Sequence, residues 1–507
     1  MQHSKEQHLV RDALLRRGWK EVAGGSDPQH LRRCLGAGSR GLGFVWLRGG
    51  DPIAWDYPRE MCTIANRWPG RTSTGRGPGL GVLWRKADLL ASLEEYYRAQ
   101  ALDPWRCHPL SFALPNGAST GSPEWESFRG VFAAVGSGSD DRVPSAQCSH
   151  NLWLLKPTSG SCGRGIGVVN SLGALQEHVK RQQAHEGGGG GKELWVVQKY
   201  VEAPLLYAGR KFDVRIFALL ESSSCETWST DLGFSLYAHR EGYGRTSSEP
   251  FSLTALHTSM HLTNYAVQKG ARHAGLHESG NAVSFTDLDV TLGSDVGFRE
   301  RLVPAMHGLI ADAVLAARPQ LLDTLHSAQT PEATYRTLLA FDLILEADGQ
   351  PLLLEVNPYP GFEPQNEWHG RYFKRLLDDY ISACVDEKGR GSARLAAGRP
   401  VVDGHHVPDY RDDGWSLLLG SGRRAVQSTG TDAACAPAPA PLFGVVPCGS
   451  RLVRAPPPPG PSMEELDEED QSNREPPSAE AVADAGADVV IERACERAAL
   501  RAAPQVM

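Results

Sequence analysis

The stretch Leu338–Pro360 reads LLAFDLILEADGQPLLLEVNPYP, in which two apolar runs flank the dipeptide Asp348-Gly349. An Asp-Gly pair between apolar runs is the strongest short-range signal for a two-residue type I′ turn. The pattern therefore predicts an antiparallel hairpin of two buried strands. With Asp348-Gly349 at the centre of the turn, the predicted partners are Ala347 with Gln350, Glu346 with Pro351, Ile344 with Leu353, and Asp342 with Glu355.

Two carboxylates, Asp342 and Glu355, then face each other in this apolar hairpin, and Asn357 shares their face of the strand. Like charges at such a position are destabilising, and burying them unpaired costs roughly several kcal/mol. A divalent cation would resolve the conflict, and oxygen ligands without Cys or His favour Mg²⁺ over zinc. We therefore predict a metal site at these three residues. The alternative is that one carboxylate reaches solvent or pairs with an arginine.

The run Arg210–Phe217, RKFDVRIF, alternates charged and apolar residues. In a strand, Lys211, Asp213 and Arg215 share one face while the intervening apolar residues face the core. A face that carries a cation, an anion and a cation suits the binding of phosphate and carboxylate groups. The alternative is a solvent-facing ladder of salt bridges.

A glycine-rich loop, TSGSCGRGIG over residues 158–167, follows a predicted strand that ends at Lys156. Backbone N–H groups of such a loop can bind phosphates within reach of that lysine. The loop lacks the G-K-[ST] of a Walker A motif, and a flexible surface hairpin explains it equally well.

Further elements surround these motifs. Apolar runs predict strands at Leu152–Leu155, Ile166–Val169 and Leu194–Gln198, and Asp88 is predicted to cap a helix. A second helix is predicted over Phe298–Arg318, with its apolar stripe at Leu302, Met306, Leu309, Ile310 and Ala313 and its end at Pro319. Gly187–Gly191 is predicted to be a floppy surface insertion. The alternation of strands and helices predicts an α/β (α+β) enzyme-like core.

Composition divides the 507 residues further. The net charge of −8 argues against a globally basic nucleic-acid binder. No run of 18 apolar residues and no apolar leader is present, so we expect no transmembrane helix and no secretory signal. The ten cysteines form no C-x-x-C pair, which indicates reduced thiols in a cytosolic protein.

The two ends of the chain differ in charge. Residues 1–83 carry 13 Lys/Arg and 7 Asp/Glu, a charge of +6, which predicts a basic N-terminal domain that meets an acidic partner; a solvated face explains it equally well. Residues 391–507 carry 11 Lys/Arg and 17 Asp/Glu and are rich in Pro and Ala, which predicts a mostly disordered acidic tail. We expect deletion of that tail to leave the fold intact.

Taken together, these motifs resemble the tubulin tyrosine ligase family, whose fold is ATP-grasp. The matching stretches, in the family's order, are Asn66–Pro69, Arg85–Asp88, Trp153–Gly167, Val197–Val201, Arg210–Arg215, Arg240–Thr246 with Ser248–Pro250, His261–Asn264 through Lys269, and Phe341–Asp342 through Leu354–Asn357. The resemblance implies two ATP-grasp lobes that close on ATP, over residues 84–200 and 201–390.

The resemblance also implies roles for particular residues. Lys86, Lys156, Lys211 and Asp213 would bind ATP, and Gln198, Lys199, Tyr200 and Val201 would form the segment that contacts adenine. Asp342, Glu355 and Asn357 would hold Mg²⁺. Arg215, Arg245 and His261 would surround the γ-phosphate and the incoming substrates.

The family activates a carboxylate of tubulin as an acyl phosphate, which the amine of an amino acid then attacks, and such chemistry needs positioning and charge neutralisation more than a nucleophilic side chain. The resemblance implies that tyrosine is the added amino acid. The alternatives are a polyglutamylase or glycylase of the same family, or a member that only binds tubulin. We expect a cytoplasmic, microtubule-associated monomer that binds the acidic tubulin tail and neither nucleic acid nor membrane.

Overall fold

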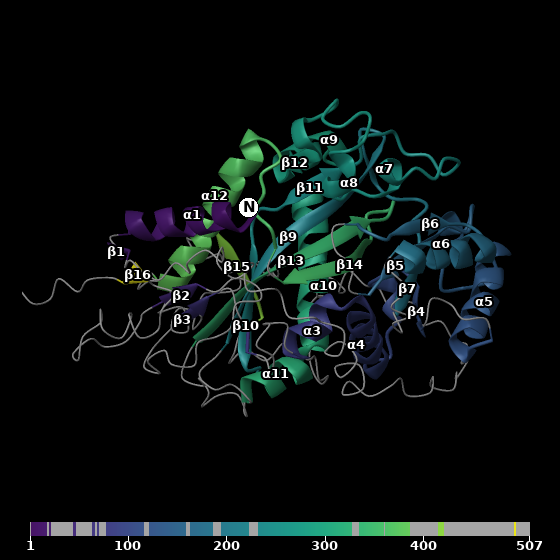
Figure 1. The fold of residues 1–507 in the computed structure, drawn as a ribbon, viewed down its shortest axis with the longest axis horizontal. Coiled ribbons are helices and arrows are strands. Elements are labelled where there is room, and N and C mark those ends of the chain that lie inside the picture. Colours follow the sequence, from purple (N-terminus) through teal and green to yellow (C-terminus); the bar gives the residue numbers. More distant parts are fainter. Residues whose placement is uncertain are drawn as a thin grey trace, which may run out of the picture. The chain divides into compact units, whose positions relative to one another are not determined.

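The structure is a computed structural model that describes residues 2–17, 20–21, 44–46, 63–65, 68–69, 78–115, 121–158, 163–185, 194–222, 232–326, 334–358, 360–385, 414–419 and 491–492. By its contacts the chain divides into two units, residues 427–488 and the remainder, and all described residues belong to the latter. The predicted mixed α/β class is confirmed, because two sheets in this unit are covered by helices (Figure 1).

A ten-stranded sheet is built around the long strands β9 and β13, which pair antiparallel. Its order is β12-β11-β9-β13-β3-β2, with β8 and β10 also on β9, β14 on β13, and β15 on β10. The bounds are β2 Phe44–Trp46, β3 Thr63–Ala65, β8 Leu206–Tyr207, β9 Arg210–Ser222, β10 Phe234–His239, β11 Tyr243–Thr246, β12 Ala282–Ser284, β13 Thr334–Leu345, β14 Pro351–Pro358 and β15 Trp415–Leu419.

Helices cover both faces of this sheet, so its central strands are buried on both sides. Side chains of α1 and α12 share a core with Phe217, Leu219, Leu338 and Ala340 on one face, and α3 and α10 contact β14 on the other. These helices and their neighbours are α1 Gln2–Arg16, α3 Pro78–Trp84, α4 Lys86–Ala99, α7 Thr258–His261, α8 Tyr265–Gln268, α9 Phe285–Leu292, α10 Val303–Ala316, α11 Arg318–His326 and α12 Glu367–Val385.

The second sheet has four strands in the order β4-β7-β5-β6. Its bounds are β4 Ser111–Leu114, β5 Trp153–Pro157, β6 Gly167–Val169 and β7 Trp195–Lys199, so the three predicted strands in this region are confirmed. Helices α5 (Pro123–Gly136) and α6 (Leu172–His185) supply Phe128, Val135 and Leu175 to a core shared with Trp153 and Trp195. A further two-stranded sheet pairs β1 (Lys20–Glu21) with β16 (Ile491–Glu492).

The β13–β14 hairpin is confirmed, but its turn is not the predicted one. Gly349 has a φ of 90°, whereas Asp348 has no positive φ, so the turn is not type I′. The N–H of Gly349 donates to the carbonyl of Glu346 and the N–H of Glu346 donates to that of Gln350, which closes a three-residue loop.

The register of the hairpin changes partway along it. Next to the turn, Ile344 pairs with Leu352 and Leu345 with Pro351, one residue off the predicted pairing. A bulge after Asp342 then restores the predicted register, and Asp342 pairs with Glu355 as expected. The longer loop shifts the register by one residue, and the bulge shifts it back. The predicted pairing of the two carboxylates is therefore correct although the predicted turn is wrong.

Two helix boundaries also differ from the predictions. Helix α4 begins at Lys86 with Arg85 as its N-cap, so Asp88 lies in the first turn rather than at the cap. The second predicted helix consists of a π-helical turn, Phe298–Leu302, followed by α10, which ends at Ala316. Pro319 does not end a helix but occupies the first turn of α11, where its missing N–H has no cost. The predicted stripe of α10 is buried throughout.

Described segments near both chain ends extend the ten-stranded sheet or pack against it. Val10 and Leu14 of α1 pack with α12, and β2 and β3 extend the sheet beside β13, so this part of residues 1–83 shares a core with the C-terminal half of the chain. Within the predicted disordered tail, Trp415–Leu419 form β15, and Trp415 is fully buried. Most of residues 391–507, and the Gly187–Gly191 insertion, lie outside the described residues.

Among the described residues, no helix is both long and apolar enough to cross a membrane. The described cysteines, Cys107, Cys148 and Cys384, are free thiols.

Candidate functional site

A cleft of about 780 Å³ lies where strands of the two sheets meet. Eleven of the fourteen predicted site residues line it, namely Lys86, Lys156, Gln198, Lys199, Val201, Lys211, Asp213, Arg245, His261, Asp342 and Glu355. They come from α4, β5, β7 and the residues after it, β9, β11, α7, β13 and β14, and they span more than half of the chain. Arg215, Tyr200 and Asn357 do not line the cleft but contact residues that do.

The charged face of β9 is buried, which excludes a solvent-facing ladder. Lys211 and Asp213 are 6% and 4% exposed, and the intervening Phe212 and Val214 pack in the core. Their charges are balanced by partners on neighbouring strands. Arg245 Nε and Nη2 each donate to Asp213 at 2.6 Å, and the hydroxyl of Thr263 donates to the same carboxylate at 2.5 Å.

The metal candidate Asp342 is paired with two arginines in the structure. Arg215 donates two hydrogen bonds of 2.7 Å to its carboxylate, and Arg245 Nη2 lies 2.9 Å from Oδ2. Burial alone would raise the pKa of Asp342, but the two guanidinium groups outweigh it and hold the pKa well below its usual range. The alternative raised by the sequence, a carboxylate paired with arginine, is therefore present in this structure.

The oxygen donors around Asp342 nevertheless fit a hard divalent cation. Asn357 Nδ2 lies 3.2 Å from Asp342 Oδ2 and 3.4 Å from Glu355 Oε1, so the three predicted ligands converge. Among the described residues no group of three His, Cys, Asp or Glu could hold a metal. The third residue of the predicted ligand set is the amide of Asn357. Its oxygen would face the carboxylates after a half-turn of the amide group, and such a ligand set suits Mg²⁺.

Three lysines give the cleft its positive charge. Lys86 Nζ lies 3.6 Å from Glu355 Oε2, Lys156 Nζ donates to Gln198 Oε1 at 2.6 Å, and Lys211 Nζ donates to the carbonyl of His261 at 2.9 Å. Burial lowers the pKa of Lys156 to about 8 and that of Lys211 to about 7. An anionic ligand would restore the charge of these ammonium groups, which suits the binding of phosphates.

His261 and Tyr200 both contact Lys211 in the structure. The carbonyl of Ala255 can only accept, so His261 Nε2 carries the proton of that 2.7 Å hydrogen bond. Burial lowers the pKa of His261, so its neutral ring accepts from the Tyr200 hydroxyl at Nδ1, 2.8 Å away. Both ring nitrogens are thus occupied. The Tyr200 ring in turn lies 4.1 Å from Lys211 Nζ.

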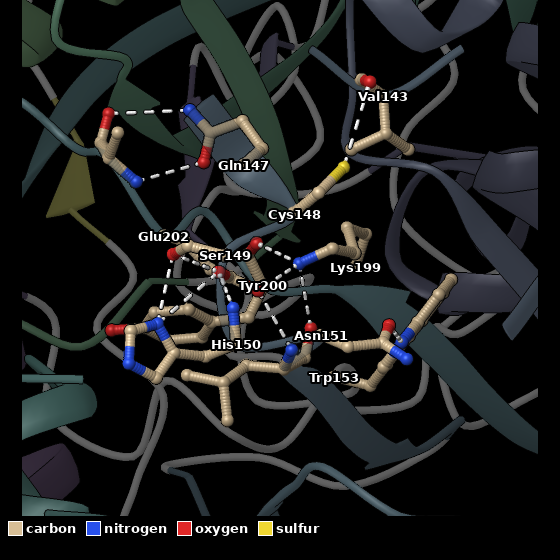
Figure 2. A network of polar contacts seen from close by, with 12 residues as sticks. Val143, Gln147, Cys148, Ser149, His150, Asn151, Trp153, Lys199, Tyr200 and Glu202 are labelled. Carbon is tan, nitrogen blue, oxygen red and sulfur yellow. Dashed lines mark hydrogen bonds and ion pairs between the residues drawn. The ribbon is translucent and has the colours of Figure 1, made fainter. Parts of the chain in front are cut away.

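The predicted cofactor residue Lys199 belongs to a buried network that Figure 2 shows. Its ammonium group donates to Glu202 Oε1 at 2.6 Å and to the carbonyls of Leu152 and Tyr200. Glu202 also accepts from the backbone N–H groups of His150 and Leu152 and from the Ser149 hydroxyl. The lysine side chain therefore links the connection after β7 to the residue before β5, and its role in binding a cofactor stays a prediction.

Sequence reasoning missed the apolar part of the cleft. Leu154, Ile344 and Leu354 line it together with Val201, and they form a surface on which a planar ring can pack. Apolar residues of buried strands look alike in a sequence, whether they border a cavity or the core. Thr263 and Asn264 also line the cleft. They lie in the His261–Asn264 motif, so the sequence marked them as part of a motif but predicted no function for either residue.

The glycine-rich loop lies at the edge of the cleft, where its described residues Gly163, Arg164 and Ile166 contribute to the lining. Gly163 and Gly165 have φ angles of 75° and 72°. Non-glycine residues rarely adopt this conformation, which explains two of the glycines that the sequence singled out. Residues 159–162 lie outside the described residues.

Comparison with known proteins gives a consistent result. The model of the tubulin-tyrosine ligase family matches residues 84–392. Human tubulin monoglycylase TTLL3 is 29% identical over 272 residues, which are 51% of this chain and 32% of that protein. Human protein monoglycylase TTLL8 is 27% identical over 261 residues (50% and 28%). Tubulin glycylase 3B of Drosophila melanogaster is 30% identical over 245 residues (47% and 29%). The match spans about a third of the length of these relatives.

Proposed function

The chain belongs to the tubulin-tyrosine ligase family, and from this premise we propose that it is an ATP- and Mg²⁺-dependent ligase that joins glycine to a carboxylate of tubulin. The observation that carries the proposal is the cleft, in which Lys86, Lys156, Lys211, Arg245 and the carboxylate pair converge from six elements of the fold, with Arg215 bonded to Asp342 beside them. The resemblance of the sequence to the tyrosine ligase favours tyrosine. The three relatives named above are glycylases, and for this reason we propose glycine instead.

The residues of the cleft suit phosphoryl transfer. Lys86, Lys156 and Lys211 would bind the phosphates, and the apolar surface of Leu154, Val201 and Ile344 would pack against the base. Asp342, Glu355 and Asn357 would hold Mg²⁺, which neutralises charge on the phosphates when it is bound. The terminal phosphoryl group passes from ATP to a carboxylate of tubulin, which yields ADP and an acyl phosphate. The amine of glycine then attacks the acyl carbon, and phosphate leaves as the amide bond forms.

Arg215 and Arg245 can stabilise the negative charge that develops during this transfer. Both are buried and fully charged, because the pKa of each lies above its usual range; Asp342 raises it for Arg215, and Asp213 and Asp342 raise it for Arg245, against the effect of burial. A phosphoryl group in the cleft offers the same bidentate acceptor geometry as the carboxylate that they now hold. Positioned cations of this kind account for much of the catalysis of phosphoryl transfer.

One assay tests the proposal. The purified chain is incubated with tubulin, ATP, Mg²⁺ and labelled glycine, tyrosine or glutamate, and incorporation into tubulin is measured. We expect incorporation of glycine. Lys156→Met should abolish it, while Lys180→Met, which changes an exposed lysine of α6, should not. Incorporation of tyrosine or glutamate instead would overturn the assignment of glycine. Incorporation of none of the three amino acids would overturn the proposed ligase activity.

A further inference from the structure

A buried chain of hydrogen bonds runs from the start of β4 to Lys156 in the cleft. The Ser111 hydroxyl donates to the carbonyl of Pro109 at 2.7 Å, and Gln198 Nε2 donates to Ser111 Oγ at 3.0 Å. On its other side, Gln198 Oε1 accepts from Lys156 Nζ at 2.6 Å. Ser111, Gln198 and Lys156 are 2%, 6% and 7% exposed, so water does not compete for these groups.

The direction of every bond in this chain follows from what each group can donate. A carbonyl oxygen only accepts, so the single hydroxyl hydrogen of Ser111 is committed to Pro109. The Ser111 oxygen can then only accept from Gln198, and the amide must present its NH₂ group to β4. Its oxygen consequently faces Lys156 and the cleft, which Gln198 lines. The hydroxyl of Ser111 thus turns Gln198 into an acceptor on the cleft side.

A second buried residue holds the carbonyl on which this arrangement depends. His108 Nδ1 lies 3.0 Å from the oxygen of Pro109, and His108 is 3% exposed. Burial lowers the pKa of His108 to about 4, so the ring is neutral and Nδ1 carries the proton of this bond. The Pro109 carbonyl therefore accepts from His108 and from Ser111. Both anchors belong to the segment that leads into β4 and do not line the cleft.

An acceptor at this place discriminates between nucleotide bases. Adenine carries an exocyclic amine that can donate to Gln198 Oε1, whereas guanine and hypoxanthine carry a carbonyl oxygen at the same ring position. Two acceptors placed together leave both unsatisfied, and a site built for a donor rejects such an analogue strongly. When phosphates draw Lys156 away from Gln198, Ser111 is the contact that still fixes the amide.

We propose that Ser111 is a positioning residue that fixes Gln198 as an acceptor and thereby selects nucleoside triphosphates whose base carries an exocyclic amine at the ring position where adenine carries it. The inference rests on the proposed function in one respect, namely that a nucleotide occupies this cleft. It concerns the choice of base and not the amino acid that is joined. ATP and ITP are suitable probes, since they differ in the amine or carbonyl group at one position of the ring.

The test measures binding of ATP and ITP to the full chain by calorimetry, in the presence of Mg²⁺ and without tubulin. We expect the wild-type protein to bind ATP about 100-fold more tightly than ITP. In Ser111→Ala the amide is free to turn, so ATP should bind more weakly, ITP more tightly, and the ratio should fall about tenfold. Ser111→Thr keeps the hydroxyl and should keep the ratio. Ser92→Ala, which changes a buried serine of α4, is the matched control.

A second variant guards against loss of folding. Ser111→Cys keeps the volume of the side chain but offers a weak hydrogen-bonding group, and it should lower the ratio as Ser111→Ala does. An unchanged ratio in folded Ser111→Ala and Ser111→Cys overturns the inference, even where glycine is still joined to tubulin. A wild-type protein that binds neither nucleotide overturns the inference together with the proposed function. Loss of discrimination in a protein that joins tyrosine rather than glycine would support the inference and overturn only the assignment of glycine.

Discussion

The carboxylate of Asp342 is 1% exposed and still charged, because Arg215 and Arg245 surround it. Removing one partner from such a buried pair leaves a charge without compensation, which is strongly destabilising. The same carboxylate is the candidate ligand for Mg²⁺. The two arginines therefore hold the carboxylate of Asp342 in place, and under the proposed function they would also contact the phosphoryl group that is transferred.

Glu355 offers a cleaner test of the metal site than Asp342. Its side chain is 26% exposed and lies 3.6 Å from Lys86 Nζ, so Glu355→Gln should leave the fold and the melting temperature nearly unchanged. Ligation should fall by about 100-fold, because the cation loses a charged ligand. Thermal melting and incorporation of labelled glycine measure the two effects. Glu346→Gln, in the same hairpin but outside the cleft lining, is the control and should stay active. An unfolded Glu355→Gln protein, or an active one, would contradict the metal assignment.

Lys211 should make nucleotide binding depend on pH. Burial lowers its pKa to about 7, and phosphates bind the charged form, so the Kd for ATP should rise by up to about tenfold per unit above pH 7. Binding of ATP thus weakens as the pH rises, whereas the nucleotide-free protein should become more stable. Between pH 7 and the ordinary lysine pKa of about 10.4, the unfolded chain binds the additional proton, so stability rises with pH.

Calorimetry between pH 6.5 and 9 measures this dependence. Lys211→Arg keeps the charge at every pH, so the weakening of binding should begin only near pH 8, where Lys156 loses its proton. A Kd for ATP that does not change over this range in the wild-type protein would show that neither lysine titrates in the cleft.

At the scale of elements, the hairpin of β13 and β14 depends on Gly349. Its φ of 90° is unfavourable for any residue with a Cβ atom, whereas the nearest contact of a new Cβ would be the flexible tip of Leu302. Gly349→Ala should therefore destabilise the protein by about 1–2 kcal/mol, mainly through the backbone. Urea denaturation measures the change. Gly361→Ala, at a position with open space around it, should be neutral within about 0.5 kcal/mol. Equal stability of the two variants would show that the loop relaxes to another turn.

Strand β15 changes the expectation for the C-terminal tail. Trp415 is fully buried in the core that α1 and α12 share, and β15 pairs with β10. A chain that ends at Arg390 loses this strand and should be destabilised by about 3–5 kcal/mol, comparable with Trp415→Ala. A chain that ends at Gly420 keeps the strand and should melt close to the full-length protein. If both truncated chains melt alike, β15 does not contribute to the core, and the deletion of the whole tail is harmless as the composition suggested.

At the scale of the whole molecule, the distribution of charge should govern the encounter with tubulin. Lys269 and Arg272 are exposed in a loop that begins one helical turn after Asn264 of the cleft, and residues 1–83 carry +6. Some of the charge in residues 1–83 is already paired, since Arg16 and Arg17 contact Asp378. We expect the double substitution Lys269→Glu with Arg272→Glu to weaken binding to tubulin about tenfold at low salt and little at high salt.

The control for this prediction is the double substitution Arg371→Glu with Lys374→Glu, which reverses two exposed charges of α12. Binding is measured with tubulin that carries or lacks its acidic tails. Equal weakening by both pairs of substitutions would indicate a general effect of net charge. An affinity that changes neither with the salt concentration nor with removal of the tubulin tails would reject electrostatic docking.

The sequence determined the features whose signals are local. Alternation of charged and apolar residues marked β9, and a turn dipeptide between apolar runs marked the hairpin, because strand periodicity and turn chemistry are carried by neighbours in the chain. These signals placed Lys211 and Asp213 on one face of a predicted strand and Asp342 and Glu355 in a predicted metal site, and the resemblance to the family joined the two. They also carried the resemblance to the family that the chain matches.

Only the tertiary structure decided which partner each charged group has. Arg215 and Asp342 are 127 positions apart, and Gln198 and Ser111 are 87 apart, so no spacing along the chain relates them. The same holds for Trp415, which looks like part of a polar tail until β10 is placed beside it. Burial makes each of these contacts strong, and burial arises only when distant segments exclude water together. Thus the sequence indicates which groups take part in the chemistry, and the fold determines which of them hold one another in place.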